Sequence, residues 1–398
     1  MSEEVGVGTF KSRLMDSTGL DHFILASSFN RFAGPNDNLL DVCNYLHGVL
    51  GVDIAVLTNV SRFDQRFLNS VRFPLYSALR GRPADPLSRV AFMPSNIGTL
   101  KSFMRAFHLS RSDIFVNSSI DTLFDASLAS GGRVKAGHNV ITTGFVTPGT
   151  DLFLGVLDRI ASRSTIGRIM ATTYYQKRIY LRLGIPERDI SVIPSCADSR
   201  SIGLYGTDDS PSGEHTENPT IMYAGRFVPD KGIRELFSAY EQLVQSVPVQ
   251  LKIIGDGPMR TWVYQKKDEI EQKSENARVL VSAGWESREK VLREMSRADV
   301  VVLPSYHEMC PVSLLEAMCL KRAIVCTRVG GPAEMITNEV DGILVSPFQV
   351  KELKEAIYRL IADETLRRRL GLNAYRTFMQ TYDVSIVAPK FRTFLESD

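Results

Sequence analysis

Residues 220–244 read TIMYAGRFVPDKGIRELFSAYEQLV and show the unit from which the second half of the chain is built. The mostly apolar run 220–224 is short and ends at Gly225, which is typical of a buried strand. From Ile233 to Val244 the apolar side chains recur at intervals of three and four residues, the period of a helix that packs on one face. The stretch therefore predicts a strand, a loop and a helix, in that order.

The same alternation continues along the chain. In the second half it predicts further strands at 251–254, 278–282, 300–303, 323–327 and 342–345, and helices at 259–273, 288–296, 312–319, from 332 and from 350. In the first half it predicts strands at 23–26, 53–57, 114–116, 168–171 and 190–193, and helices near 35–50, 97–109, 120–130 and 173–183. Short buried strands that alternate with helices indicate parallel sheets covered on both faces, an α/β fold.

The length of 398 residues favours two domains, because one hydrophobic core rarely organises so long a chain. Residues 199–218 hold few large apolar side chains and many turn formers, as linkers do. We therefore expect a Rossmann-like N-terminal domain over 1–199, with 1–20 frayed, a linker over 200–218 and a ligand-binding C-terminal domain over 219–380. Two such domains facing each other would create a cleft.

Composition excludes several classes of protein. No apolar run approaches the roughly 20 residues that cross a bilayer, and the first 21 residues lack the order of a secretory signal. Five cysteines without metal-ligand spacing indicate reduced thiols, no metal site and a cytoplasmic location. The net charge of +2 argues against nucleic acid as a partner.

The loop 225–232 carries the first candidate site. It follows a predicted strand, on the edge of the sheet where such folds bind ligands. Arg226 can bind two phosphate oxygens at once and Lys231 can act as a point charge, so a diphosphate is the natural ligand. The alternative is two surface cations beside a helix-capping Asp230.

A second candidate site follows the predicted strand 300–303. Pro311 fits the first position of a helix, and the free N–H groups of Val312 and Ser313 would then point toward the same edge as Arg226 and Lys231.

Two carboxylates accompany that helix start. Glu308 lies on the loop before the helix, and Glu316 lies little more than one turn inside it, within reach of ribose hydroxyls. Both carboxylates could instead be solvated. Because the helix around Glu316 reads as buried, a carboxylate there needs a partner, and a ligand hydroxyl would supply it.

Together these residues resemble the retaining glycosyltransferases of family four, which have the GT-B fold. The motifs that carry the resemblance stand in the family's order: 225–232, the turn 254–258, Glu308 with Glu316, 329–334, 341–345 and, in the first domain, 167–172 and 190–198. The resemblance covers residues 165–385 well and 20–160 only loosely. It implies two doubly wound domains facing a cleft, with a C-terminal helix over 381–398 that crosses back to the first domain.

The resemblance also implies roles for the residues. Arg226 and Lys231 would bind the diphosphate of a nucleotide-sugar donor and stabilise the leaving group without a metal ion or other cofactor. Glu316 would hold the donor ribose, and Glu308 would contact the hydroxyls of the transferred sugar. The N–H groups near Pro311 and Val312 would assist, and the base would lie near Gly284 and Trp285. Transfer would retain the anomeric configuration.

The first domain would supply the acceptor side. Gly34 lies in a loop, 33–38, that would approach the phosphates, although the family often has two glycines there. His138 is the candidate for a histidine near the donor sugar, against an ordinary surface or packed histidine. The stretches 63–82 and 101–111 interleave basic and aromatic residues, so they could form a peripheral membrane-surface patch or a solvated helix face over core aromatics.

Three functions remain open from the sequence. The first is a glycosyltransferase whose acceptor is a glycan, a lipid-linked sugar or a small molecule. The second is a nucleotide-sugar epimerase or a phosphorylase of the same architecture, and the third is a non-catalytic nucleotide-sugar-binding protein. Hydrolysis of the donor or transfer of its sugar, measured with the purified protein, distinguishes the first function from the others.

Overall fold

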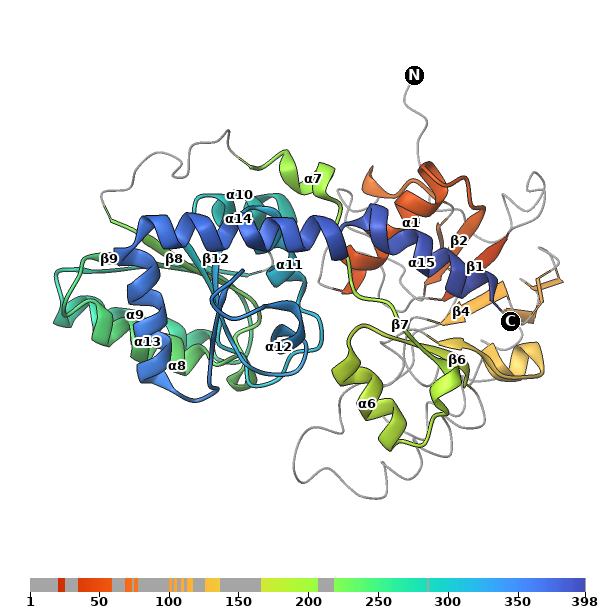
Figure 1. Ribbon diagram of the computed structural model, residues 1–398, viewed down its shortest axis with the longest axis horizontal. Coiled ribbons are helices and arrows are strands. Elements are labelled where there is room, and N and C mark those ends of the chain that lie inside the picture. Colours follow the sequence, from red (N-terminus) through yellow and green to blue (C-terminus); the bar gives the residue numbers. More distant parts are fainter. Residues whose placement is uncertain are drawn as a thin grey trace. The chain divides into compact units, whose positions relative to one another are not determined.

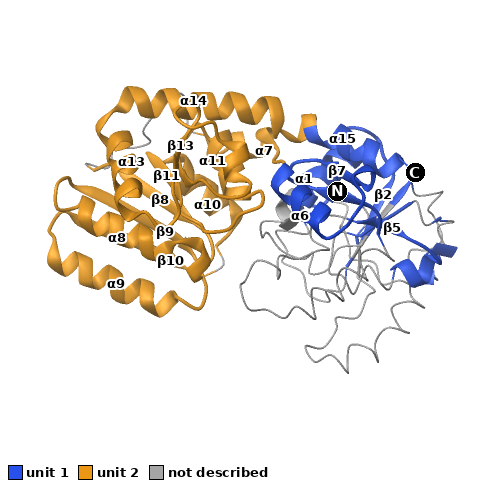
Figure 2. Ribbon diagram, turned by 60° about the horizontal axis from the view of Figure 1, so that its bottom comes forward, with its two compact units in different colours: residues 1–194, 387–398 blue, residues 195–386 orange. Residues whose placement is uncertain are grey.

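The structure is a computed structural model of the chain. It describes residues 21–25, 35–58, 69–73, 75–77, 100–101, 104–105, 109–110, 113–116, 126–136, 166–206, 218–284 and 286–397. Everything below concerns these residues. They divide into two compact units (Figure 2): unit 1 comprises residues 1–194 and 387–398, and unit 2 comprises residues 195–386.

Unit 2 is built on a parallel sheet of six strands in the order β10-β9-β8-β11-β12-β13. The strands are β8 (Thr220–Ala224), β9 (Val249–Gly255), β10 (Ala277–Ala283), β11 (Val300–Leu303), β12 (Ala323–Thr327) and β13 (Ile343–Val345). The helices are α7 (Ser199–Gly203), α8 (Ile233–Leu243), α9 (Arg260–Lys273), α10 (Arg288–Ser296), α11 (Val312–Cys319), α12 (Pro332–Met335), α13 (Val350–Ala362) and α14 (Glu364–Thr381), with a 3-10 turn η4 (Pro229–Lys231).

Alternate residues of the strands face two separate cores, as the period of two in a strand requires. Along β8, Ile221 and Tyr223 join the core under α8, α9 and α13. Met222 joins the core under α10, α11, α12 and α14. In Figure 1, α8, α9 and α13 lie below the sheet, and α10 and α14 lie above it. The predicted α/β arrangement of this half is confirmed, and each predicted strand and helix is present within three residues of its predicted bounds.

Unit 1 contains a parallel sheet of seven strands in the order β3-β2-β1-β4-β5-β6-β7. The strands are β1 (His22–Leu25), β2 (Ile54–Thr58), β3 (Leu75–Ser77), β4 (Ile114–Val116), β5 (Val134–Ala136), β6 (Ile166–Ala171) and β7 (Ile190–Val192). The described helices are α1 (Pro35–Gly48), α6 (Tyr174–Arg182) and a 3-10 turn η3 (Glu187–Asp189). Five of the strands were predicted, whereas β3 and β5 were not.

The last helix, α15 (Val384–Glu396), leaves unit 2, and its residues from Val387 onward belong to unit 1. Phe391 and Phe394 pack edge-on against Phe115 of β4, with ring centroids 5.1 and 6.0 Å apart. Beside them, Lys135 of β5 donates a hydrogen bond to the carbonyl of Leu395. The C-terminal helix α15 thus packs against the sheet of unit 1.

The stretch between the two sheets differs from the predicted linker over 200–218. The units divide between Pro194 and Ser195, and residues 199–203 form α7. Asp198 caps this helix by accepting a hydrogen bond from the N–H of Arg200 at 3.0 Å. The polar stretch that we interpreted as a linker therefore contains the start of a helix. Helix N-caps and linkers both favour small polar residues such as serine and aspartate.

Candidate functional site

The order of strands in unit 2 marks a place for a ligand. The chain runs from β8 outward through β9 to β10 on one side, and from β11 outward through β12 to β13 on the other. The direction reverses between the neighbouring strands β8 and β11, and doubly wound sheets bind ligands at the carboxyl ends of the strands at such a reversal. The loops after β8 and β11 carry the cations and carboxylates singled out above.

The loop after β8 is held by main-chain contacts with the turn after β9. The N–H of Gly225 donates to the carbonyl of Ile254 at 3.0 Å, and that of Phe227 donates to Asp256 at 2.7 Å. A Cβ on Gly255 would lie 1.8 Å from the carbonyl oxygen of Gly225, so only glycine allows this approach. Arg226 is fixed at its backbone while its side chain is exposed.

A buried tyrosine supports the same loop. The hydroxyl of Tyr223 donates a hydrogen bond to the carbonyl of Arg226 at 2.8 Å. Burial, reinforced by the negative charges of Glu308 and Asp230, raises the pKa of Tyr223 above its ordinary value. The hydroxyl therefore stays protonated at neutral pH and remains a donor.

The loops after β8 and β11 meet through their backbones. The N–H of Tyr306 donates to the carbonyl of Asp230 at 2.8 Å. Beyond the loop, the N–H of Gly331 donates to the carbonyl of Glu308 at 3.0 Å. These contacts set the distance between the segment that carries Lys231 and the segment that carries Glu308.

Lys231 and Glu308 form an ion pair at this meeting point. Their Nζ and Oε1 atoms are 2.6 Å apart, with 16% and 13% of the two side chains exposed. The hydroxyl of Ser305 donates to the same Oε1 at 2.9 Å. An ammonium group and a carboxylate are thus both presented at the reversal point, a cation for anionic oxygens and an acceptor for hydroxyl groups.

Glu316 lies in α11, where only 7% of its side chain is exposed. The Nε atom of Arg288, at the start of α10, is 3.1 Å from Glu316 Oε1, and only 9% of the arginine side chain is exposed. The sequence led us to expect a ligand hydroxyl as the partner of this buried carboxylate. In the structure a protein side chain, that of Arg288, pairs with the carboxylate, and the hydrogen bond to a ligand hydroxyl stays a prediction.

The start of α11 also differs slightly from the prediction. Pro311 caps the helix from outside with extended backbone (φ −69°, ψ 124°), and Val312 takes the first helical position. Helices leave their first N–H groups without partners within the helix. Those of Val312 and Ser313 therefore lie at the helix start, in the segment that follows Glu308.

The remaining candidates are less well defined. Gly284 directly follows β10 and has φ 127°. Its N–H donates to the carbonyl of Gly255 at 3.0 Å, which places it beside the turn after β9. Trp285, Gly34 and His138 lie outside the described residues. His307 is exposed next to Glu308.

Cys310 lies between Glu308 and α11, so its thiol is a candidate nucleophile at the site. Burial raises the pKa of the Cys310 thiol to about 11. The thiol is therefore neutral at physiological pH, which argues against a nucleophilic role. Within the described part of the chain, no cluster of three or more histidine, cysteine or acidic side chains could hold a metal ion.

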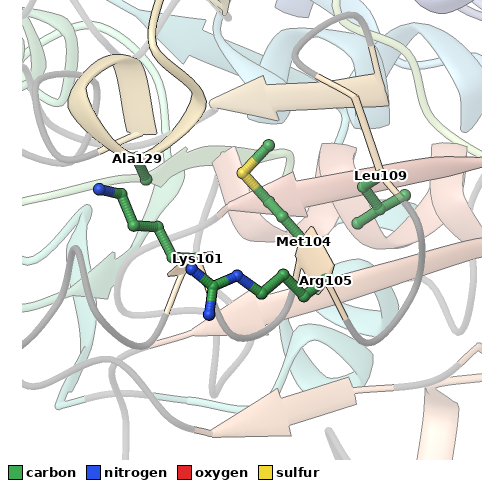
Figure 3. A pocket seen from close by; sticks show the side chains of 5 residues that line it. All are labelled: Lys101, Met104, Arg105, Leu109 and Ala129. Carbon is green, nitrogen blue, oxygen red and sulfur yellow. The ribbon is translucent and has the colours of Figure 1, made fainter.

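Unit 1 has a depression of its own, of about 550 Å³, lined by Lys101, Met104, Arg105, Leu109 and Ala129. Figure 3 shows two basic side chains, those of Lys101 and Arg105, around it. The rest of the stretches 63–82 and 101–111 lies mostly outside the described residues. Among the helices that the structure describes, none is long and apolar enough to span a bilayer.

Part of the chain is similar in sequence to known proteins. Residues 206–377 match the family model of the glycosyl transferases group 1. Alpha-D-kanosaminyltransferase of Streptomyces kanamyceticus is 32% identical over 171 residues, which are 43% of this chain and 41% of that protein. The chain thus spans about two fifths of the length of the first curated relatives that it matches.

Solved structures resemble the chain over nearly its whole length. The Anabaena protein HepE in complex with UDP-glucose has a TM-score of 0.74 and 19% identity, covering 94% of this chain and 100% of HepE. Sucrose-phosphate synthase from Thermosynechococcus elongatus has a TM-score of 0.70 and 18% identity, covering 94% and 98%. These likenesses show the fold, the α/β GT-B fold with its two Rossmann-like parallel sheets.

Proposed function

We propose that the chain is a glycosyltransferase that moves a sugar from a nucleotide-diphosphate sugar to an acceptor, with retention of configuration and without a metal ion. Residues 219–380 would bind the donor and residues 1–199 would carry the acceptor side. The observation that carries the proposal is the Lys231–Glu308 pair, 2.6 Å apart at the strand reversal of a glycosyl transferases group 1 domain. HepE, a neighbour of the same fold, was solved in complex with UDP-glucose, which supports a nucleotide-sugar ligand.

The cations would stabilise the leaving group. When the bond between the sugar carbon and the diphosphate oxygen breaks, negative charge grows on the diphosphate. The exposed Arg226 can bind two phosphate oxygens, and Lys231 can approach a third as a point charge. The N–H groups at the start of α11 would add a positive helix end.

Glu308 would hold the sugar. Its carboxylate pairs with Lys231 and accepts a hydrogen bond from the hydroxyl of Ser305. On donor binding Lys231 would turn toward the diphosphate, and Glu308 would accept hydrogen bonds from sugar hydroxyls. The acceptor hydroxyl would attack the sugar carbon and lose its proton to the departing diphosphate or to solvent. Glu316 would accept hydrogen bonds from the ribose.

The proposal is tested by turnover. Hydrolysis or transfer should be measured with UDP-, GDP- and ADP-sugars for the unaltered protein, Lys231→Met and Glu308→Gln. The matched control is Lys267→Met, because Lys267 and Glu271 of α9 form an ion pair of the same 2.6 Å length on an outer helix. Activity should fall at least about 100-fold in the first two variants and persist in the control. Nucleotide binding without turnover of any donor would instead identify a non-catalytic binding protein.

The acceptor side is a separate part of the proposal. We propose peripheral contact with an anionic membrane surface, supported by the basic pair Lys101 and Arg105 beside the depression of unit 1. Juxtamembrane basic residues each contribute roughly 1 kcal/mol near such a surface. Sedimentation with anionic liposomes at low salt should carry the protein down, and a Lys101→Ala/Arg105→Ala variant should sediment less. Absence of sedimentation at low salt would contradict the proposed membrane contact, but it would not bear on the proposed glycosyltransferase activity.

A further inference from the structure

Arg288 was not recognised as a site residue from the sequence, yet the structure brings it to Glu316. It is the first residue of α10, whereas Glu316 lies in the middle of α11, and the two side chains meet with Nε and Oε1 3.1 Å apart. Both side chains are more than nine-tenths buried. The pair is therefore a contact between two helices, each of which begins at the ligand edge of the sheet.

The backbone of Arg288 is well anchored. Ser287 caps α10, its hydroxyl accepting a hydrogen bond from the N–H of Lys290 at 3.2 Å. Just before it, Glu286 pairs with the ammonium group of Lys290 at 2.7 Å and accepts a hydrogen bond from Ser282 of β10. These contacts tie the end of the loop after β10 to the helix. The backbone from which the Arg288 side chain projects is therefore held at the capped start of the helix.

The chemistry of a buried carboxylate requires such a partner. A carboxylate removed from water is costly unless a charge or hydrogen-bond donors compensate it. A planar guanidinium group compensates the charge of the carboxylate and fixes the plane of its oxygens. A carboxylate held in one orientation can present both oxygens to two neighbouring hydroxyl groups, whereas a freely rotating one must lose that freedom on binding.

We propose that Arg288 is a positioning residue that holds Glu316 as a fixed acceptor for the 2′- and 3′-hydroxyls of the donor ribose, and that it thereby sets the preference for ribonucleotides. The inference rests on the proposed function and deepens it, since it assigns recognition of the ribose to a two-residue unit. Arg288 acts through Glu316 and needs no contact of its own with the ligand.

The test compares ribonucleotides with their deoxygenated forms. Binding of UDP, GDP and ADP is measured by calorimetry, each beside its 2′,3′-dideoxy form, for the unaltered protein, Arg288→Met, Arg288→Lys, Glu316→Gln and the double variant Arg288→Met/Glu316→Gln. The matched control is Arg293→Met, at an exposed arginine of the same helix. Circular dichroism checks the folding of each variant. Arg288→Lys retains the positive charge, so it serves if the unpaired carboxylate prevents Arg288→Met from folding.

The expected result is a loss of discrimination. The ratio of dideoxy to ribonucleotide dissociation constants should fall about tenfold or more in Arg288→Met, fall in Arg288→Lys, and stay unchanged in Arg293→Met. In the Glu316→Gln background, adding Arg288→Met should change the ratio no further, because the two residues act as one unit. An unchanged ratio in the folded Arg288 variants would overturn the inference.

The failure of this inference and that of the proposed function have different signatures. If Glu316→Gln lowers the ratio while the Arg288 variants do not, the ribose site stands and Arg288 is only structural. If Glu316→Gln leaves the ratio unchanged, the ribose assignment itself is wrong. If no nucleotide binds to the unaltered protein, the proposed donor site itself is wrong, whatever the roles of Arg288 and Glu316.

Discussion

The α-carbon of Gly232 lies so close to Pro304 that a Cβ on the glycine would be 1.9 Å from the proline carbonyl oxygen. Gly232 has φ 65°, in the left-handed region, and directly follows Lys231. Pro304 follows β11 in the loop that leads to Glu308. This single glycine therefore permits the two site loops to touch.

Gly232→Ala should disrupt both the fold and the site. The left-handed backbone costs an L-residue about 1–3 kcal/mol, and the clash with main-chain atoms of Pro304 adds to that cost. We expect urea denaturation to show a loss of more than about 2 kcal/mol, together with weaker nucleotide binding. The control is Gly203→Ala in α7, where a Cβ meets nothing within 4 Å. Equal stability of the two variants would contradict the close approach.

Lys231 and Glu308 should separate binding from turnover. Lys231→Met removes a cation from the diphosphate, so the affinity for the nucleotide should fall by about tenfold or more. Glu308→Gln removes the carboxylate that competes for Lys231, so the affinity should stay level or rise while transfer falls. Calorimetry and a transfer assay on the same preparations measure the two effects. A parallel fall of affinity and turnover in both variants would contradict the exchange of partners.

The C-terminal helix should contribute strongly to the stability of unit 1. Phe391 is 3% exposed and packs edge-on against Phe115. Phe391→Ala leaves a cavity at that contact and should cost about 3–5 kcal/mol in the free energy of unfolding, as buried phenylalanines do. The neighbouring Arg392→Ala, at a surface ion pair with Glu396, should cost less than about 1 kcal/mol. Urea denaturation of the two variants measures these losses in the free energy of unfolding. Equal losses would show that the helix contributes little to the stability of unit 1.

The stability of unit 1 should fall with decreasing pH because of His22. Burial, helped by the charge of Lys135, lowers the pKa of His22 below 6.5, while Asp21, Asp113 and Glu396 oppose the shift. The folded protein then binds the proton less readily than the unfolded chain, so stability is complete above about pH 6.5 and declines below it. Between pH 7.5 and 5 the unaltered protein should lose more stability in urea denaturation than His22→Leu. Identical pH dependence would contradict this assignment.

Much of unit 2 could be predicted from its sequence because the local signals agree with one another. The apolar run of β11, the proline before α11 and the apolar residues inside that helix all indicate the same boundaries, and the structure has β11 at Val300–Leu303 and α11 at Val312–Cys319. Parallel strands then bring the loops after β8 and β11 to one edge. Contact between Lys231 and Glu308 follows from that topology.

Two features that the sequence did not predict, β5 and the role of Arg288, depend on contacts with residues that are distant in sequence. β5 (Val134–Ala136) is three residues long, and its central residue is a lysine, which hides the apolar signal of a strand. Lys135 is nevertheless buried, because it donates to Leu395, 260 residues away. Arg288 was missed for a similar reason. Sequence spacing shows that a buried Glu316 needs a partner, but it does not show that another helix supplies it.

The most direct test of the account is calorimetric titration of the protein with UDP, GDP and ADP, repeated with Lys231→Met and Lys267→Met. We predict that at least one nucleotide binds to the unaltered protein, that Lys231→Met weakens this binding about tenfold or more, and that Lys267→Met leaves it unchanged. Absence of binding by all three nucleotides, or equal affinity in the two lysine variants, would contradict the claim that the edge between β8 and β11 is a diphosphate site.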